Sequence, residues 1–309
     1  MNYKLLISFV LIISILSSCS RNPTPDPTPV DTLAAGWKKI SMPTEDFSDI
    51  FFISNTGYTV GGANIYRSTD GGNNWQKVYN STAPFVNIAM GSENNIAFVG
   101  HSNKIIFTKN GGASFDSVTI NDQLNDIYFV NATTAYGIGN SFWKTTNAGS
   151  NWTKLYDFTT NFYRSLYFLN EMNGWMAGTG GAVFKTTNGG LNWEQKTVGS
   201  DLDLSTGNVY FVDQNNGYVT DGTRVAKTTN AGSSWSKVFT GSSPFIDLHF
   251  ISADVGYITA GGHLHKTING GATWTKELAL TNIALYEVHF TDSNHGWACG
   301  GSGVLKFEK

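Results

Sequence analysis

Acidic and amide side chains recur at one position of a short pattern that appears seven times along the chain. The pattern is a polar residue, an aliphatic one, a variable one and usually Phe, as in Asp126-Ile-Tyr-Phe129. Its first position holds Asp49, Asn87, Asp126, Ser165, Asn208, Asp247 and Glu287. Two carboxyl groups roughly 5 to 10 Å apart perform the chemistry in most glycoside hydrolases. A fold that brought Asp49, Asp247 and Glu287 together would therefore make glycoside hydrolysis possible.

The other reactive side chains form weaker patterns. His263 and His265 alternate on one expected strand and share a face, but no carboxylate or third ligand accompanies them, so we expect no metal site. His249 and His289 stand where other repeats have Tyr, and Cys299 stands where others have Ala, Val or Thr, which favours packing roles. The sequence has no Ser-His-Asp elbow, phosphate loop or Cys-x-x-Cys pair. We therefore expect no cofactor.

A repeated turn positions these residues. The motif Ser/Thr-x-Asp/Asn-x-Gly-x-x-Trp/Phe occurs six times and ends at Trp75, Phe115, Trp152, Trp193, Trp235 and Trp274. Its acidic or amide position is Asp70, Asn110, Asn147, Asn188, Asn230 and Asn269. An Asp or Asn oxygen accepts nearby backbone N–H groups in a tight turn, and Gly supplies the left-handed conformation. Because five of the six are Asn, we interpret the motif as structural and not as a calcium loop.

Each turn lies late in a unit of four short strands, and the units repeat every 37 to 42 residues, as the aromatic positions 75, 115, 152, 193, 235 and 274 show. Short strands, even spacing and a Gly/aromatic motif per unit are typical of a β-propeller. The pattern predicts an all-β, seven-bladed propeller of four-stranded antiparallel blades over residues 37–309. The last unit lacks its fourth strand, and Trp37-Lys-Lys-Ile40 resembles one. We expect this N-terminal strand to complete the last blade and remove an exposed edge.

The N-terminus carries a targeting signal. Lys4 precedes an apolar run from Leu5 to Leu16, followed by Ser17-Ser18-Cys19, the order of a signal peptide with its cleavage site. Leu16-Ser-Ser-Cys19 resembles the bacterial lipoprotein signal. We therefore expect residues 1–18 to be removed, Cys19 to be lipidated, and residues 19–36 to form a Pro-rich spacer. The expected location is the bacterial cell envelope, at the outer membrane, with the lipid as the only membrane contact.

The composition excludes several classes of protein. Charged residues make up 14% of the 309-residue chain, and the net charge is −3. A nucleic-acid-binding protein would carry an excess of Lys and Arg. With 14% aromatic residues the chain is not disordered, and two cysteines cannot form a disulfide framework. We expect a monomer that binds no nucleic acid.

The turn motif resembles the Asp-box, or BNR repeat, of sialidase-like propellers. The second strands, such as Gly174-Trp-Met-Ala-Gly178, and the run from Lys185 to Trp193 resemble the photosystem II assembly and stability factor family. This resemblance covers about residues 37–309. It implies that the first strands line a central channel, that ligands bind at the channel mouth opposite the Asp-box turns, and that the protein is a non-enzymatic scaffold. The Arg-Ile-Pro motif of sialidases is absent.

We therefore predict an envelope-anchored binding or scaffold propeller that engages an envelope protein or a glycan at its channel mouth. The candidate binding residues are Asp49, Asn87, Asp126, Arg164, Asn208, Arg224, Asp247, His263 and Glu287. Two alternatives stay open. The polar ring could be a channel rim satisfied by water and loop N–H groups, or two of Asp49, Asp247 and Glu287 could catalyse glycoside hydrolysis.

Overall fold

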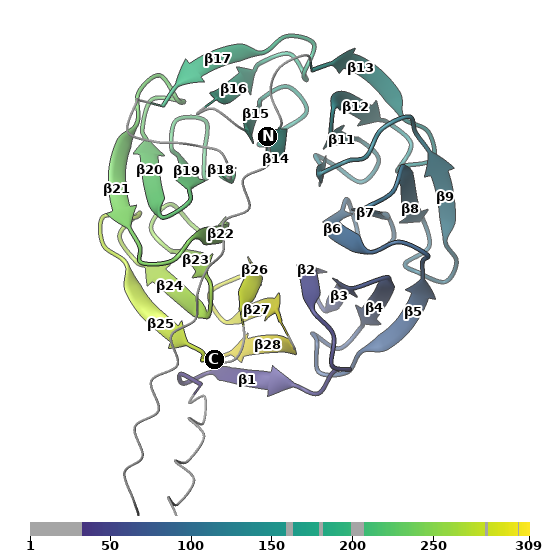
Figure 1. Ribbon diagram of the computed structural model, residues 1–309, viewed down its shortest axis with the longest axis horizontal. Coiled ribbons are helices and arrows are strands. Elements are labelled where there is room, and N and C mark those ends of the chain that lie inside the picture. The colour runs from purple at the N-terminus through teal and green to yellow at the C-terminus, as the bar shows by residue number, and fades with distance from the viewer. Residues whose placement is uncertain (1–32, 159–162, 179–181, 199–206, 282–283, 302) are drawn as a thin grey trace, which may run out of the picture. The chain divides into compact units, whose positions relative to one another are not determined.

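A computed structural model describes residues 33–158, 163–178, 182–198, 207–281, 284–301 and 303–309. The predicted signal peptide, Cys19 and most of the predicted spacer lie outside this part. Asp31–Lys309 is one compact unit. Its described residues form seven four-stranded antiparallel sheets arranged as blades around a centre (Figure 1). The predicted all-β, seven-bladed propeller is confirmed. In this part of the chain, no helix has the length and apolar character needed to cross a membrane.

The strands follow the order of the sequence, and in blades 1 to 6 they run from the innermost strand to the outermost. Blade 1 contains β2 (Phe47–Ile53), β3 (Thr56–Gly61), β4 (Asn64–Ser68) and β5 (Gln76–Asn80); blade 2 contains β6 (Phe85–Met90), β7 (Ile96–Gly100), β8 (Lys104–Thr108) and β9 (Asp116–Thr119). Blade 3 contains β10 (Asp126–Phe129), β11 (Ala135–Ile138), β12 (Ser141–Thr145) and β13 (Thr153–Asp157); blade 4 contains β14 (Tyr163–Phe168), β15 (Gly174–Gly178), β16 (Ala182–Thr186) and β17 (Glu194–Thr197). Blade 5 contains β18 (Val209–Phe211), β19 (Gly217–Asp221), β20 (Arg224–Thr228) and β21 (Ser236–Thr240); blade 6 contains β22 (Phe245–Phe250), β23 (Gly256–Ala260), β24 (His263–Thr267) and β25 (Thr275–Ala279). Blade 7 contains β26 (Leu285–Phe290), β27 (His295–Gly300), β28 (Gly303–Glu308) and β1 (Trp37–Ile40).

The N-terminal strand closes the ring. β1 pairs antiparallel with β28, with Trp37 opposite Phe307 and Ile40 opposite Val304. The Trp37 ring is buried and lies 5.3 Å from the Phe307 ring and 6.0 Å from the Phe290 ring, measured between centroids. The predicted closure of the last blade by residues 37–40 is therefore confirmed, and it covers an edge that would otherwise be open to other chains.

The Gly/aromatic motif of the second strands explains how blades stack. A Cβ on Gly57 would lie 2.2 Å from the ring of Phe52, so only Gly lets that ring lie flat against its own blade. The other face of Phe52 stacks on Trp297 of the preceding blade, with centroids 3.6 Å apart. The pairs Phe168–Tyr136, Phe211–Trp175, Phe250–Tyr218 and Phe290–Tyr257 repeat this stacking at 3.7 to 4.2 Å. In these five blades the first-strand Phe is thus held between a Gly and an aromatic ring, which fixes the spacing of the blades.

The Asp-box turns end the third strands. In the first turn, Asp70 Oδ1 accepts hydrogen bonds from the N–H groups of Asn73 and Asn74 at 3.0 and 2.9 Å. The Ser68 hydroxyl donates to Asp70 and accepts the N–H of Gly72 at 2.9 Å. The carboxylate therefore reaches three and four residues along the chain, which is one and two residues further than the sequence leads us to expect. Each fourth strand begins one residue after the motif's aromatic position.

Candidate functional site

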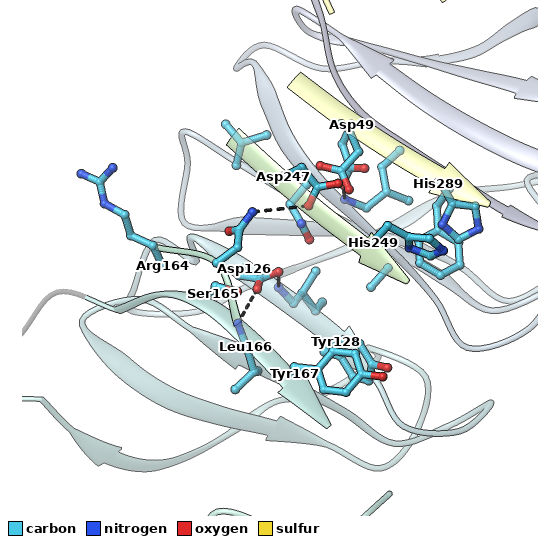
Figure 2. Close-up of a pocket in the computed structure, with 18 of the residues that line it drawn as sticks. Asp49, Asp126, Tyr128, Arg164, Ser165, Leu166, Tyr167, Asp247, His249 and His289 are labelled. Carbon is cyan, nitrogen blue, oxygen red and sulfur yellow. Dashed lines mark hydrogen bonds between the residues drawn. The ribbon is translucent and has the colours of Figure 1, made fainter. Parts of the chain in front are cut away.

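The first strands of the blades surround a cavity of about 360 Å³ at the centre of the propeller. All seven first-position side chains of the sequence pattern line it: Asp49, Asn87, Asp126, Ser165, Asn208, Asp247 and Glu287. Figure 2 shows Asp49, Asp126 and Asp247 gathered within it. The exposed residues among those that line it are Arg164 and Ile246, which lie near the starts of their first strands, so we take this end of the cavity as its mouth. Because neighbouring strands are antiparallel, the Asp-box turns lie at the opposite face.

A β-bulge next to most of these side chains sets their orientation. In five blades the register between the first and second strand shifts immediately before the channel residue, as between Phe47 and Asp49 or between Phe245 and Asp247. A bulge adds one residue to a strand and turns the neighbouring side chains. The extra residues, which are Ser48, Val86, Arg164, Ile246 and Tyr286, also line the cavity. They form its mouth.

The channel side chains connect neighbouring blades. Asp49 accepts the N–H of Ile88 at 2.6 Å, and Asp126 accepts that of Leu166 at 2.7 Å. Ser165 accepts the N–H of Val209, and Asp247 that of Val288, both at 3.1 Å. An innermost strand has no partner on its channel side, so its N–H groups need other acceptors. These four channel residues therefore each accept an N–H group of the next blade, and Asn208 donates to the carbonyl of Ile246 in the next blade at 2.6 Å.

A second layer of side chains lies two residues further along each first strand. It consists of Phe51, Ala89, Tyr128, Tyr167, Tyr210, His249 and His289, all of which line the cavity. Tyr210 donates to the carbonyl of Phe250 at 2.7 Å. His249 and His289 contact the carbonyls of Phe290 and Phe52 through Nε2, at 3.0 and 2.9 Å. These three side chains thus bind carbonyl groups of the innermost strands, whereas the first layer binds their N–H groups.

The carboxyl groups of the cavity are poorly solvated. Burial is the largest cause that raises the pKa of Asp126 to about 7 and of Asp247 to about 6. Burial, with the nearby carboxyl groups, also holds the pKa values of Asp49 and Glu287 well above their usual range. Burial lowers the pKa of His249 to about 4 and of His289 to about 3, so both imidazoles are neutral at pH 7. The cavity therefore concentrates partly protonated acids beside neutral rings.

The remaining predicted residues fall into two groups. Arg164 lines the mouth and points away from Asp126 and Asp247 in Figure 2. Arg224 and His263 do not line the cavity. Arg224 pairs with the buried Asp221 at 2.6 Å, and His263 lies beside His265 with ring centroids 6.1 Å apart.

The three carboxyl groups that the sequence offered for glycoside hydrolysis, those of Asp49, Asp247 and Glu287, line the same cavity. Hydrolases hold two carboxyl groups roughly 5–9.5 Å apart around the glycosidic bond. In this cavity Asp49 and Asp247 already accept the N–H groups of Ile88 and Val288. Within the described residues, no group of three or more His, Cys, Asp or Glu side chains is arranged to hold a metal ion.

Sequence reasoning missed the bulges and the functional meaning of the aromatic layer. It also missed a series of lysines on the third strands, each lying over the second-strand aromatic of its own blade. Lys144, Lys185, Lys227 and Lys266 lie 5.2 to 5.4 Å from the ring centroids of Tyr136, Trp175, Tyr218 and Tyr257. The repeated Lys-Thr before each turn was the available signal. Lys227 also donates to the carbonyl of Gly270 in the next blade at 2.7 Å, so this contact holds blades together.

Comparison with solved structures confirms the architecture. A structure described as YCF48 bound to D1 peptide is 20% identical, with a TM-score of 0.76 over 92% of this chain and 99% of that one. YCF48 from Cyanidioschyzon merolae is 19% identical, with a TM-score of 0.74 over 89% and 99%. The WD40 repeats of RRP9 are 10% identical, with a TM-score of 0.75 over 90% and 99%. At these identities the similarity establishes the fold alone. No curated protein matches the chain.

The family comparison is more specific. Residues 30–166 and 144–243 match the family model of the photosynthesis system II assembly factor YCF48. Together the two matches span residues 30–243, which is more than half of the 309-residue chain. The resemblance drawn from the second strands and the turn motif is thereby confirmed, and the chain belongs to the YCF48 family of photosystem II assembly factors.

Proposed function

We propose that this protein is a non-enzymatic propeller that holds a segment of a partner protein at its channel mouth. The observation that carries this proposal is the membership of the YCF48 family, together with a cavity that opens at one face. A YCF48 structure is described as bound to a D1 peptide. That structure supports a peptide as the kind of ligand.

The mouth has the side chains that a peptide site needs. The bulge residue Ile246 is 38% exposed, although it is a large apolar side chain, and Arg164, two blades away, is also exposed. Apolar surface beside polar groups is typical of protein-binding sites.

The proposed place of action is the bacterial envelope. Its support is the order of Lys4, the apolar run and Cys19 in the sequence. A lipid on Cys19 and the Pro-rich residues that follow would hold the propeller at a membrane surface, with the mouth available to envelope proteins.

Site-specific photo-crosslinking tests the position of the partner. A benzophenone amino acid replaces Ile246 at the mouth in one variant and Ile268 in the other. Ile268 lies in an Asp-box turn on the opposite face and is 71% exposed. We expect mass spectrometry to find a partner polypeptide attached at position 246 and not at position 268. Attachment at 268 alone, or turnover of envelope glycans by the purified chain, would contradict the proposal.

A further inference from the structure

The carboxyl groups of the cavity are not explained by the fold alone. Ser165 occupies the same position as Asp49, Asp126 and Asp247, and its neutral hydroxyl accepts the N–H of the next blade just as they do. A hydroxyl is therefore sufficient for the contact between blades. Buried carboxylates are costly unless they are paired. Four of the seven first-layer positions nevertheless carry Asp or Glu.

An unsatisfied acceptor lies in the same wall. Asn87 lines the cavity together with Asp126, and its side-chain oxygen is buried and has no hydrogen-bond partner among the described residues. Buried polar atoms without partners are rare in native proteins, and each one requires an explanation. A hydrogen-bond donor entering the cavity would satisfy Asn87 and face the carboxyl group of Asp126 at the same time.

The second layer adds aromatic rings below these acceptors. Neighbouring rings contact one another from Tyr128 through Tyr167, Tyr210, His249 and His289 to Phe51, with centroids 4.3 to 5.7 Å apart. The series is open at Ala89, whose small side chain leaves a gap in the wall. Aromatic faces attract cations, and aromatic cages are used to recognise organic ammonium groups. Neither imidazole in this layer competes as a cation at pH 7.

The three features fit one kind of ligand. A positively charged hydrogen-bond donor would contact the carboxyl groups and Asn87. An alkyl chain attached to that donor would pack against the aromatic rings of the second layer. A ligand with an anionic or carbonyl group would place its own hydrogen-bond acceptors against the acceptors of the cavity. The volume of about 360 Å³ lies at the lower end of the range for ligand pockets, which is roughly 300 to 1,000 Å³. A single side chain fits such a space better than a folded segment does.

We infer that the cavity receives the ammonium or guanidinium group of a Lys or Arg side chain that the partner protein inserts from the channel mouth. This inference rests on the proposed function and specifies its chemistry. Asp126, Asp247 and Asn87 contact the cation, and Tyr128 and its neighbours contact its alkyl chain. Partner segments with a protruding basic residue are thereby selected over neutral ones.

Calorimetric titration of the full-length chain tests this inference. The probes are acetyl-Gly-Lys-Gly-amide, the same peptide with Gln in place of Lys, and n-butylammonium chloride. We expect the Lys peptide to bind at least about tenfold more tightly than the Gln peptide. Equal affinity for the two peptides, or binding of neither, would overturn the inference. If n-butylammonium bound as tightly as the Lys peptide, the cavity would be a site for free amines, and the assignment to a partner side chain would be wrong.

Matched variants locate the site. Asp126→Asn keeps an oxygen for the N–H of Leu166 and removes the charge, and we expect it to weaken the Lys peptide at least about tenfold. Glu93→Gln removes an exposed charge outside the cavity and should change nothing. Tyr128→Leu should weaken binding about threefold, whereas Tyr128→Phe, which keeps the ring, should not. Unchanged affinity in folded Asp126→Asn protein would refute the site. Crosslinking at position 246 that persists with a partner lacking basic residues would refute the cation but not the propeller's binding function.

Discussion

The carboxyl group of Asp126 makes the stability of the propeller depend on pH. Burial is the main cause that raises its pKa from 3.8 to about 7, and the N–H groups of Leu166 and Ile127 offset only part of this effect. Between these two pH values the folded chain keeps a proton on Asp126 that the unfolded chain has released. The unfolded state therefore binds fewer protons, and the free energy of unfolding falls as pH rises through this window.

The magnitude follows from the two pKa values. Ionising a carboxyl group whose pKa rises from 3.8 to about 7 on folding costs about 4 kcal/mol of stability above pH 7. Asp126→Asn removes this cost. It also removes one acceptor, because Asp126 Oδ1 and Oδ2 receive the N–H groups of Ile127 and Leu166, each at 2.7 Å. Losing one such bond costs about 1 kcal/mol.

The sign of the effect should therefore reverse with pH. We expect Asp126→Asn to be more stable than the parent by about 3 kcal/mol near pH 8, and less stable by about 1 kcal/mol near pH 3. Urea unfolding followed by Trp fluorescence measures both values, provided that the m value stays constant. Glu93→Gln serves as the control for loss of one negative charge. A variant that is destabilised equally at both pH values would refute the reasoning, since the carboxylate would then stabilise the ring in its ionised form.

Five other substitutions, at four positions, separate the remaining contributions. Trp37→Ala should destabilise the ring by about 3–5 kcal/mol in urea unfolding, because it leaves a cavity where the buried indole of the closing strand packs. Asp70→Asn should be nearly neutral at pH 7, since the other turns use Asn, whereas Asp70→Ala should cost about 1 kcal/mol by the same measurement. Tyr218→Phe should cost no more than about 1 kcal/mol, because Lys227 still donates to the carbonyl that the hydroxyl contacts. Cys19→Ala should abolish incorporation of labelled palmitate and release the protein from membranes; labelling that persists would contradict the lipoprotein prediction.

Much of the fold could be predicted because its signals are local. The Asp-box turn is closed by bonds within seven residues, such as those from Asp70 to Asn73 and Asn74. The strand that follows each turn is also fixed locally. Ring closure was predictable for a different reason. The last unit has only three strands, and a matching fourth strand stands at the N-terminal end of the propeller, so few other pairings are available to either. The Gly at the start of a second strand, such as Gly57, was visible as a pattern in the sequence. The reason for it was not, because the ring of Phe52 that leaves no room for a Cβ there is held in place by stacking on Trp297 of another blade.

The site was less predictable because it depends on contacts between blades. The bulge residues Ser48, Val86, Arg164, Ile246 and Tyr286 share no chemical property, since a bulge depends on the backbone of two strands and not on one side chain. The acceptors for the channel N–H groups come from blades about forty residues away, as the bond from Ile88 to Asp49 shows. Arg224 and His263 were expected near the mouth from their loops, yet neither lines the cavity.

The same side chains hold the ring together and face the cavity, and this overlap determines how function must be tested. Removing a channel residue altogether would break a contact between blades, and lost binding would then report only lost structure. Ser165 shows that a neutral acceptor suffices for that contact. A change of charge that keeps an acceptor, such as Asp to Asn, therefore keeps the bond between blades and removes the charge that a ligand would use. Burial also makes the ionised carboxyl groups unfavourable to folding. They therefore lower the stability of the ring, although a neutral acceptor would make the same contact between blades. A property that costs stability and is not needed for structure is best explained by binding, and a cation is the ligand that would offset this cost.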